Sequence, residues 1–315
     1  MERASGGLLA TSQQDPALSG NGKWLAVISD LRGRQTVQLR NVINGSIQAL
    51  PQLKRHQPHS SPSLSWNGRY IALITQHGRR RMAVIADRLN GRLHPIQLPG
   101  GRDPIQVSLA PDAQTLALQV TDQGLWRVEI FDLSDVLEID RPAGQALSTP
   151  PLTPAHMKMV SLSLGVLLFL AGCSSDLPRP RSELNGLLRQ SVSSRRDPSL
   201  GQIWLASLGK RGGRERIELI DLRNRRPVPL PGLNRADAQP ISLSVSGDGA
   251  RIAVVQQRDD RTELFLYRRN AAALQRIPLD PPGVPRSVSL DGSGRLLAVQ
   301  VSRNGRWDVD LIRLP

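Results

Sequence analysis

Short apolar segments separated by polar turns recur along the chain with a period of about 45 residues. Each unit contains one copy of a repeated sequence phrase. All copies share an alanine, which recurs at intervals of 46, 45, 89, 47 and 45 residues. These alanines are Ala26, Ala72, Ala117, Ala206, Ala253 and Ala298. Self-similarity at this period predicts a repeat architecture in which each unit is one small sheet.

Within each unit, the pattern of apolar and polar positions predicts antiparallel strands. Fragments such as Ser63-Leu64-Ser65 alternate with period two, which suits an inner strand. Asn21-Gly22, Asn67-Gly68 and Asp248-Gly249 follow such fragments, and dipeptides of this type permit a tight hairpin. The more apolar second strands are expected at Trp24–Ser29, Tyr70–Thr75, Leu116–Val120, Ile252–Gln256 and Leu296–Val301.

A third and a fourth strand complete the predicted unit. The third strands are expected at Val37–Leu39, Met82–Ala86, Val128–Phe131, Ile217–Ile220, Glu263–Tyr267 and Asp308–Ile312. Fourth strands are expected at Ile96–Leu98, Val228–Leu230 and Arg276–Leu279. Four strands in each repeat predict an all-β fold, a six-bladed β-propeller of four-stranded antiparallel blades built as two three-blade halves.

The sixth unit stops at its third strand, so we expect a strand from elsewhere to complete it. Gly7–Thr11 is the candidate for blade six, and Gly186–Gln190 is the candidate for blade three. Residues Ala146–Thr149 are an alternative for blade three. Closure removes unpaired blade edges, which are an aggregation risk. The predicted organisation is blades one to three in residues 1–133, a linker in 134–185, and blades four to six in 186–315.

The repeated phrase Pro-x-x-Ser-x-x-Gly-(Asp/Asn)-Gly-x-x-(Ile/Leu)-Ala-(Val/Leu) resembles the repeat of TolB-type (PD40, WD40-like) propellers. The resemblance covers residues 15–133 and 194–315. It implies a propeller that binds other proteins and has no catalytic activity of its own. It also implies a place in the bacterial cell envelope.

A segment of a different kind separates the two halves. Lys158 precedes an uncharged, mostly apolar run, Met159–Ala171, that ends in Leu170-Ala171-Gly172-Cys173. A positive start, a short apolar body and small residues at the end are typical of a secretory signal. The segment 157–173 resembles a bacterial lipoprotein signal, which implies processing at Leu170, Ala171 and Gly172 and acylation of Cys173.

Two other interpretations of this segment remain open, namely a buried core helix and a membrane-spanning helix. Thirteen helical residues would measure about 20 Å, against roughly 30 Å for the hydrocarbon core of a bilayer. If the segment is a signal, the chain is either two joined reading frames or a natural fusion with a relic signal. The first half has no export signal of its own, whereas the second half begins with one.

Charge suggests an anionic partner without identifying it. The net charge is +14, and residues 157–315 contribute +10 of it. The basic clusters form a candidate binding patch that is expected to gather on one rim, and the alternative is a set of solvated loop arginines. These clusters comprise Arg79, Arg80, Arg81, Arg223, Arg225, Arg226, Arg268 and Arg269. Aromatic residues are not interleaved with them, so we expect no nucleic-acid binding.

Catalytic and metal-binding patterns are not found in the sequence. All histidines lie in the first half, and no Gly-x-Ser-x-Gly nucleophile elbow occurs. His56-x-x-His59 has the spacing of metal ligands but no neighbouring cysteine or carboxylate. We therefore expect a protein that is not an enzyme and has no metal or cofactor.

The predicted function is a non-catalytic binding or scaffold protein of the cell envelope. Its partners would be envelope proteins, and the lipid on Cys173 would hold the second half at the membrane, which places the protein in the periplasm. Two alternatives are an accessory propeller of a peptidase or hydrolase system and an intracellular propeller scaffold without export.

Overall fold

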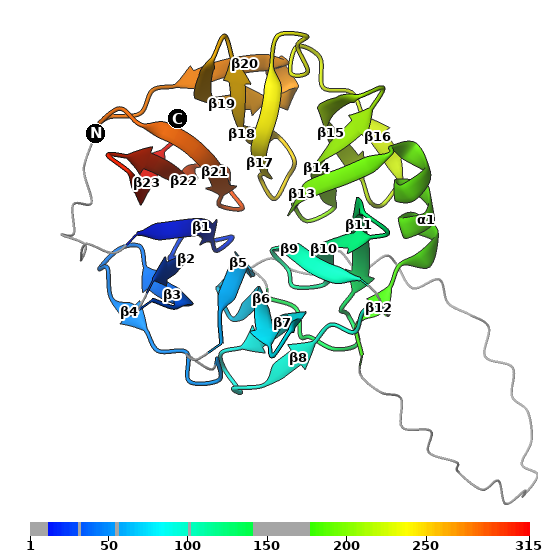
Figure 1. Cartoon of the computed structure of the whole chain (residues 1–315), viewed down its shortest axis with the longest axis vertical. Helices are drawn as coiled ribbons and strands as arrows, with labels where there is room; N and C mark the ends of the chain where they lie inside the picture. The colour runs from blue at the N-terminus through cyan, green and yellow to red at the C-terminus, as the bar shows by residue number, and fades with distance from the viewer. Residues whose placement is uncertain (1–11, 31–32, 54–56, 100–101, 141–176) are drawn as a thin grey trace, which may run out of the picture.

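Six antiparallel sheets are arranged in a ring in the computed structural model (Figure 1). It describes residues 12–30, 33–53, 57–99, 102–140 and 177–315, and all structural statements below concern these residues. Five sheets have four strands and the sixth has three. The predicted six-bladed propeller is confirmed.

Each blade is a meander in which neighbouring strands in sequence are hydrogen-bonded neighbours. Blades one and two contain β1 (Gln13–Leu18), β2 (Trp24–Asp30), β3 (Gln35–Asn41), β4 (Ile47–Gln48), β5 (His59–Leu64), β6 (Tyr70–His77), β7 (Arg80–Asp87) and β8 (Leu93–Pro95). Blades three and four contain β9 (Asp103–Leu109), β10 (Thr115–Asp122), β11 (Leu125–Asp132), β12 (Arg179–Pro180), β13 (Ser194–Leu200), β14 (Trp204–Arg211), β15 (Arg214–Asp221) and β16 (Arg226–Val228). Blades five and six contain β17 (Gln239–Val245), β18 (Arg251–Arg258), β19 (Arg261–Arg268), β20 (Ala273–Ile277), β21 (Val284–Leu290), β22 (Leu296–Arg303) and β23 (Arg306–Arg313).

The antiparallel meander gives the ring two distinct faces, because successive turns fall at opposite strand ends. One face carries the turns between first and second strands and those between third and fourth strands. The chain also ends there, at Pro315, and we call it the C-terminal face. The opposite face carries the turns between second and third strands and the links between blades.

The core lies between neighbouring blades, where apolar side chains of one sheet pack on the next. Leu39 of blade one and Leu73 of blade two are fully buried in one such cluster, and Val255 and Val299 join blades five and six in another. The apolar second strands predicted from sequence supply most of these side chains. Burial between sheets is the driving force for ring assembly.

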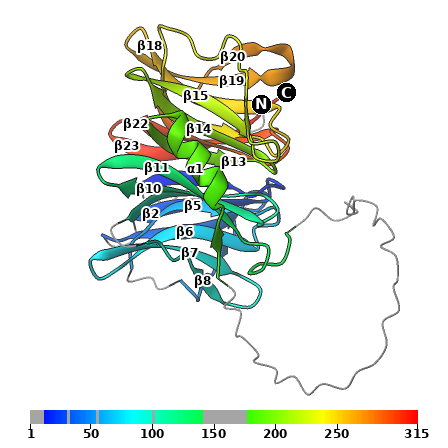
Figure 2. The ribbon, with the colours of Figure 1, turned by 90° about the vertical axis from the view of Figure 1, so that its right-hand side faces the viewer.

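The prediction that Gly186–Gln190 forms a strand is wrong. These residues lie in helix α1 (Ser182–Ser191), which packs along the outside of the ring (Figure 2). Leu184 and Leu188 are one helical turn apart and are both buried against blades three and four. The i, i+4 spacing of these leucines is the physical reason for the helix, because it gives one apolar stripe.

Blade three nevertheless obtains its fourth strand from the second half, because β12 pairs with Phe131 and Asp132 of β11. Helix α1 covers the rest of that edge. The side-chain amide of Asn185 accepts a hydrogen bond from the Ile130 nitrogen at 2.7 Å and donates one to the Ile130 oxygen at 3.2 Å. One asparagine therefore replaces a strand residue at this edge.

The other predicted fourth strands are displaced toward the C-terminal face. Blades two, four and five place them at β8, β16 and β20, which end at Pro95, Val228 and Ile277. Pro229 and Pro278 follow two of these ends, and proline has no amide hydrogen with which to continue the ladder.

Blade six has three strands in the described part of the chain, in agreement with the sequence. The segments predicted to close the two blades, Gly7–Thr11 and Ala146–Thr149, lie outside the described residues. Closure of blade six therefore stays a prediction.

Backbone hydrogen bonds link the first turns of successive blades around the axis. Three successive bonds, all of 2.9 Å, join a backbone nitrogen to a backbone oxygen of the next blade. They run from the Gln202 nitrogen to the Gly247 oxygen, from the Gly247 nitrogen to the Gly292 oxygen, and from the Gly292 nitrogen to the Gly20 oxygen. The series continues from Asn21 to Trp66 at 3.0 Å and from the Trp66 nitrogen to the Pro111 oxygen at 2.6 Å. Pro111 has no amide hydrogen, so it cannot donate to blade four in the way that the Trp66 nitrogen donates to Pro111.

Candidate functional site

A cavity of about 410 Å³ lies on the axis of the ring. Residues of the first strands of all six blades line it, among them Ala17, Ser63, Ser108, Ser199, Ser244 and Ser289. First strands of neighbouring blades belong to different sheets, so their amides need partners from outside their own ladder. The acceptors that bind these amides therefore define the cavity wall.

Serine hydroxyls link the first strands of adjacent blades at five of the six junctions. Each hydroxyl accepts a hydrogen bond of 2.9–3.0 Å from an amide of the next first strand. The pairs are Ser63 with Leu109, Ser108 with Leu200, Ser199 with Val245, Ser244 with Leu290 and Ser289 with Leu18. Blade one has Ala17 at this position. The Ser-Leu-Ser alternation in the sequence thus supplies a structural ring around the cavity.

Two aspartates occupy equivalent positions three blades apart in the cavity wall. Asp15 and Asp197 each precede a proline at a bulge in the first strand, and both have a left-handed backbone, with φ of 49° and 52°. Aspartate tolerates this conformation better than most residues. Because the blades are numbered around a ring of six, Asp15 and Asp197 lie on opposite walls.

The carboxylates of both aspartates accept backbone hydrogen bonds from the following blade. Asp15 accepts from the Ser61 nitrogen at 3.2 Å, and Asp197 accepts from the Leu243 nitrogen at 2.7 Å. Asp197 also accepts from Nε2 of Gln106 at 2.7 Å. Burial raises the pKa of both carboxyls, and these hydrogen bonds partly oppose that rise.

Two arginines contribute positive charge to the same cavity. The charge of Arg286 acts to lower the pKa of Asp15, although burial outweighs it. Arg196 is held by Glu215 through two hydrogen bonds of 2.7 Å. The cavity therefore presents both signs of charge together with backbone carbonyls and hydroxyls, which suits a ligand with several polar groups.

Sequence reasoning did not identify Asp15 or Asp197 as site residues. The available indication was the Asp-Pro dipeptide that opens the repeated phrase in the first unit of each half, Asp15-Pro16 and Asp197-Pro198. That dipeptide was used only to align the repeats.

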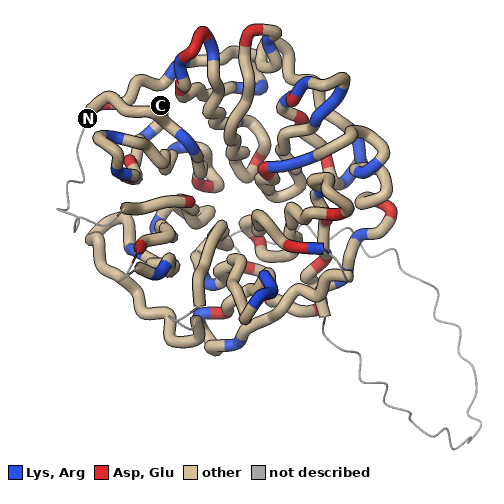
Figure 3. The backbone as a smooth tube through the Cα atoms, viewed as in Figure 1, with Lys and Arg blue, Asp and Glu red and all other residues tan. Residues whose placement is uncertain are grey.

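The predicted basic patch separates into two groups on opposite faces. Arg79, Arg80 and Arg81 lie at the turn between β6 and β7, on the opposite face of the ring. Arg223–Arg226 and Arg268–Arg269 lie between third and fourth strands of blades four and five, on the C-terminal face. The expectation that all these arginines gather on one rim is therefore wrong. In a meander, the turn between the second and third strands and the turn between the third and fourth strands lie at opposite strand ends. Figure 3 shows basic and acidic positions interleaved around the whole ring.

Some arginines of the C-terminal face pack on tryptophans of the preceding blade. Arg269 lies over the Trp204 ring at 4.4 Å, and Arg88 lies over the Trp24 ring at 4.5 Å. The two arrangements are three blades apart, as expected for two similar halves. These two tryptophans therefore pack against an arginine of the next blade.

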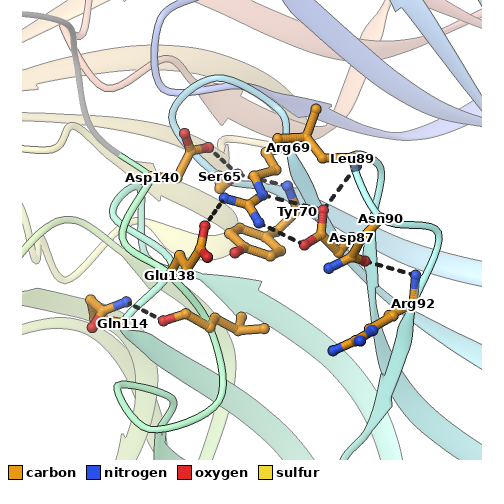
Figure 4. A network of polar contacts seen from close by, with 11 residues as sticks. Ser65, Arg69, Tyr70, Asp87, Leu89, Asn90, Arg92, Gln114, Glu138 and Asp140 are labelled. Carbon is orange, nitrogen blue, oxygen red and sulfur yellow. Dashed lines mark hydrogen bonds and ion pairs between the residues drawn. The ribbon is translucent and has the colours of Figure 1, made fainter.

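The segment before residue 141 is fixed to blade two on the C-terminal face (Figure 4). The buried Asp140 carboxylate accepts hydrogen bonds from the Ser65 hydroxyl, from the Asn67 nitrogen at 2.9 Å and from the Asn67 side-chain amide at 2.7 Å. Glu138 pairs with Arg69 at 2.6 Å, and Arg69 also pairs with Asp87 at 2.9 Å. Residues 134–140, which show no repeat pattern, thus have defined contacts.

The histidine pair is not assembled as a metal site in the described residues. His59 is buried, and its Nδ1 accepts a hydrogen bond from the Val37 nitrogen at 3.3 Å. Burial lowers the pKa of His59 to about 4. His56 lies outside the described residues. In the ranges given above, no group of three or more histidine, cysteine, aspartate or glutamate side chains could hold a metal ion.

The proposed lipidation and processing residues, Leu170, Ala171, Gly172 and Cys173, lie outside the described residues. No helix within the described ranges is long and apolar enough to cross a membrane.

Comparisons with known proteins show the fold. No family model matches the chain, and no curated protein matches it. Among solved structures, TolB from Acinetobacter baumannii is similar, with 15% identity and a TM-score of 0.62, over 94% of this chain and 62% of that chain. The chain thus spans less than two thirds of the length of that protein.

Two further solved structures are similar at comparable levels. Putative TolB from Agrobacterium tumefaciens has 11% identity and a TM-score of 0.58, over 88% of this chain and 84% of that chain. The β-propeller domain of the Trilobed protease from Pyrococcus furiosus has 11% identity and a TM-score of 0.55, over 96% and 97%. At these identities, the similarity establishes a shared propeller fold.

Proposed function

We propose that this chain is a non-catalytic binding or scaffold propeller of the bacterial cell envelope. The partner is another envelope protein, and a lipid on Cys173 holds the second half at a membrane in the periplasm. The repeated phrase and the structural similarity to TolB proteins support this proposal.

The observation that carries the binding role is the polar axial cavity. Its volume of about 410 Å³ lies within the range of ligand sites in proteins. Carboxylates on opposite walls, the half-buried Asp15 and the buried Asp197, can accept hydrogen bonds from amides or cationic groups of a bound segment. The serine hydroxyls that link the first strands hold the cavity wall rigid, which reduces the entropic cost of binding.

Partner capture with a matched variant tests this role. The full chain is cross-linked to envelope proteins and captured, beside a double variant with Asp15→Asn and Asp197→Asn. The double variant keeps the size of both side chains and one acceptor oxygen on each, but removes both charges. We expect the partner identified with the native chain to be lost or strongly depleted with the variant. Equal recovery with both proteins would contradict a role for the cavity.

Intact-mass measurement tests the envelope and lipid part of the proposal. The mature second half, isolated from a bacterial membrane fraction, is expected to begin at an acylated Cys173. The Cys173→Ser variant is the control, because it cannot be acylated at this position. A single unmodified soluble species of 34.5 kDa would end the lipoprotein proposal.

The similarity to the Trilobed protease propeller favours a second candidate, an accessory propeller of a peptidase or hydrolase system. Recovery of a hydrolase in the capture experiment, with loss of its activity when the propeller is removed, would favour this role. Recovery of envelope proteins without a hydrolase favours the scaffold.

A further inference from the structure

The C-terminal face of blades four to six is rich in arginine. The strand ends and turns there carry six arginines that reach the surface of this face, and we call them the arginine face. They are Arg223, Arg225, Arg226, Arg268, Arg295 and Arg313. They come from three adjacent blades, so they form one continuous sector of the ring.

Three aspartates on the same sector accept backbone hydrogen bonds within their turns, and the six arginines outnumber them. Asp221 accepts from the Arg223 nitrogen at 2.8 Å, Asp248 from the Ala250 nitrogen at 2.9 Å, and Asp291 from the Leu296 nitrogen at 2.9 Å. Within the described residues, the single ion pair made by the arginine face joins Arg225 to Glu183, and both side chains are largely exposed.

On the opposite face of the same blades, several arginines are paired with acids. Arg258 pairs with Asp237 at 3.1 Å, and Arg196 pairs with Glu215 at 2.7 Å. Arg303 pairs with Asp310. The arginine face differs from these pairs in that five of its six arginines form no ion pair within the described residues.

Two features of the arginine face cost stability without an evident gain within the fold. Arg225 has a φ of 56°, at the turn position that glycine occupies in blades one and two, where Gly45 and Gly91 both have a φ of 70°. Arg268 lies directly opposite Arg251 in the ladder, and like charges in register repel. An external anionic partner would offset the repulsion within this pair and give the strained arginine a role.

The path of the chain brings this face close to the proposed lipid. Four peptide steps separate Cys173 from Leu177, the first described residue before β12, and they span at most about 14 Å. Helix α1 begins at this face, where Glu183 meets Arg225. A lipid on Cys173 would therefore be attached within about 14 Å of Leu177, which precedes the outer strand of blade three.

We propose that the arginine face binds anionic phospholipid headgroups and orients the propeller with its C-terminal face toward the membrane. This inference rests on the proposed lipid anchor. A single acyl chain gives only marginal membrane binding, and a basic surface beside it supplies the second contact that stable anchoring needs. Arginine is well suited to phosphate because its planar guanidinium can form two parallel hydrogen bonds.

Vesicle binding by the full chain with Cys173→Ser tests the arginine face without the lipid. The probes are vesicles of phosphatidylglycerol and phosphatidylcholine, compared with vesicles of phosphatidylcholine alone, at 150 and 500 mM salt. The test variant combines Arg223→Gln, Arg225→Gly and Arg226→Gln. The matched control combines Arg79→Gln, Arg80→Gln and Arg81→Gln, which removes the same charge from the opposite face. Thermal melting verifies that both variants fold.

We expect binding to the anionic vesicles only, with a roughly 100-fold lower partition coefficient for the test variant. This factor corresponds to about 1 kcal/mol for each arginine near an anionic surface. The control variant should bind within about twofold of the parent, and 500 mM salt should weaken binding because charges are then screened beyond a few ångströms.

Equal binding to neutral vesicles, or an equal loss in both variants, would overturn the proposal. So would binding of the arginine face to a soluble acidic protein or an anionic glycan but not to vesicles. The lipid anchor is measured separately by intact mass. An unacylated mature protein that still binds anionic vesicles would refute the anchor and leave the arginine face in place.

Discussion

Asp140 accepts a hydrogen bond from the hydroxyl of Ser65 at a position where other blades use a residue of their own turn. In blade one the equivalent hydroxyl, that of Ser19, donates to Asn21, and in blade five that of Ser246 donates to Asp248. Asp140 reaches this position from a segment that follows blade three. Blade two therefore obtains its turn acceptor from a distant part of the chain.

Asp140→Ala is expected to lower the free energy of unfolding by about 2–3 kcal/mol. The substitution leaves the Ser65 hydroxyl and the Asn67 amide without their charged acceptor, and such hydrogen bonds contribute about 1.5–3 kcal/mol. Chemical denaturation measures the change. Glu138→Ala is the control, because its exposed ion pair with Arg69 contributes at most about 1 kcal/mol. Similar losses for both variants would contradict the special role of Asp140.

Asp197→Ala and Asp197→Asn should have clearly different effects on stability. Alanine leaves the buried Leu243 amide unpaired and tolerates the left-handed backbone poorly, so we expect a loss of about 2–4 kcal/mol. Asparagine keeps an acceptor, tolerates the backbone and removes a desolvated charge, so its effect should be below about 1 kcal/mol. Urea denaturation compares the two, and an asparagine variant as unstable as alanine would show that the charge itself is required.

Stability should fall as the pH decreases from about 6.5 to about 4 because of His59. Its folded pKa of about 4 lies below the unfolded value of 6.5, so within this window the unfolded chain binds the extra proton. The effect amounts to about 3 kcal/mol at pH 4, from about 1.4 kcal/mol for each pH unit. Thermal melting across this range measures it. The His59→Gln variant keeps an acceptor for Val37 and should have a flatter profile, and an unchanged slope would exclude His59 as the cause.

Arg225→Gly is expected to stabilise the fold by about 0.5–1 kcal/mol. Removing a side chain from the left-handed region relieves about 1–2 kcal/mol, and the greater entropy of glycine in the unfolded chain offsets part of this gain. Arg223→Gly in the same turn is the control, because Arg223 does not have a positive φ and should lose stability. Equilibrium unfolding of both variants measures whether each substitution raises or lowers the free energy of unfolding.

Deletion of residues 1–12 should lower the melting temperature sharply if Gly7–Thr11 completes blade six. The side chains of Val309 and Leu311 on β23 are only partly buried, and β23 has no fourth strand beside it in the described residues. Replacement of Gly7–Thr11 by a glycine–serine segment of equal length separates loss of the strand from loss of length. An unchanged melting temperature in both variants would rule out this mode of closure.

The architecture was predictable because each repeat contains its own strand pattern and turn residues. Gly22, Gly68 and Gly249 have a positive φ, as the predicted hairpins require. The strand order also allows the two faces to be assigned, so the separation of Arg79–Arg81 from Arg268–Arg269 followed from the predicted meander. Local periodicity therefore predicts the strands and also the face of the ring on which each turn lies.

The errors and omissions concern contacts between distant parts of the chain. Gly186–Gln190 was predicted as a strand by analogy with Gly7–Thr11, although Leu184 and Leu188 have helical spacing. The contact of Asp140 with blade two has no local pattern at all. The cavity role of Asp197 depends on partners in two neighbouring blades, which a single repeat cannot reveal.

Pro111 has a consequence for the way in which the two halves can exist. Pro111 lies at the junction of blades three and four, which is also the junction at which residues 141–176 separate the halves in sequence. Two separately synthesised chains, divided within that segment, would therefore retain all the backbone hydrogen bonds named above between first turns. The links run from blade four through blade six to blade one and end at blade three. A circular permutant that begins with blade four would follow the order in which the blades are bonded.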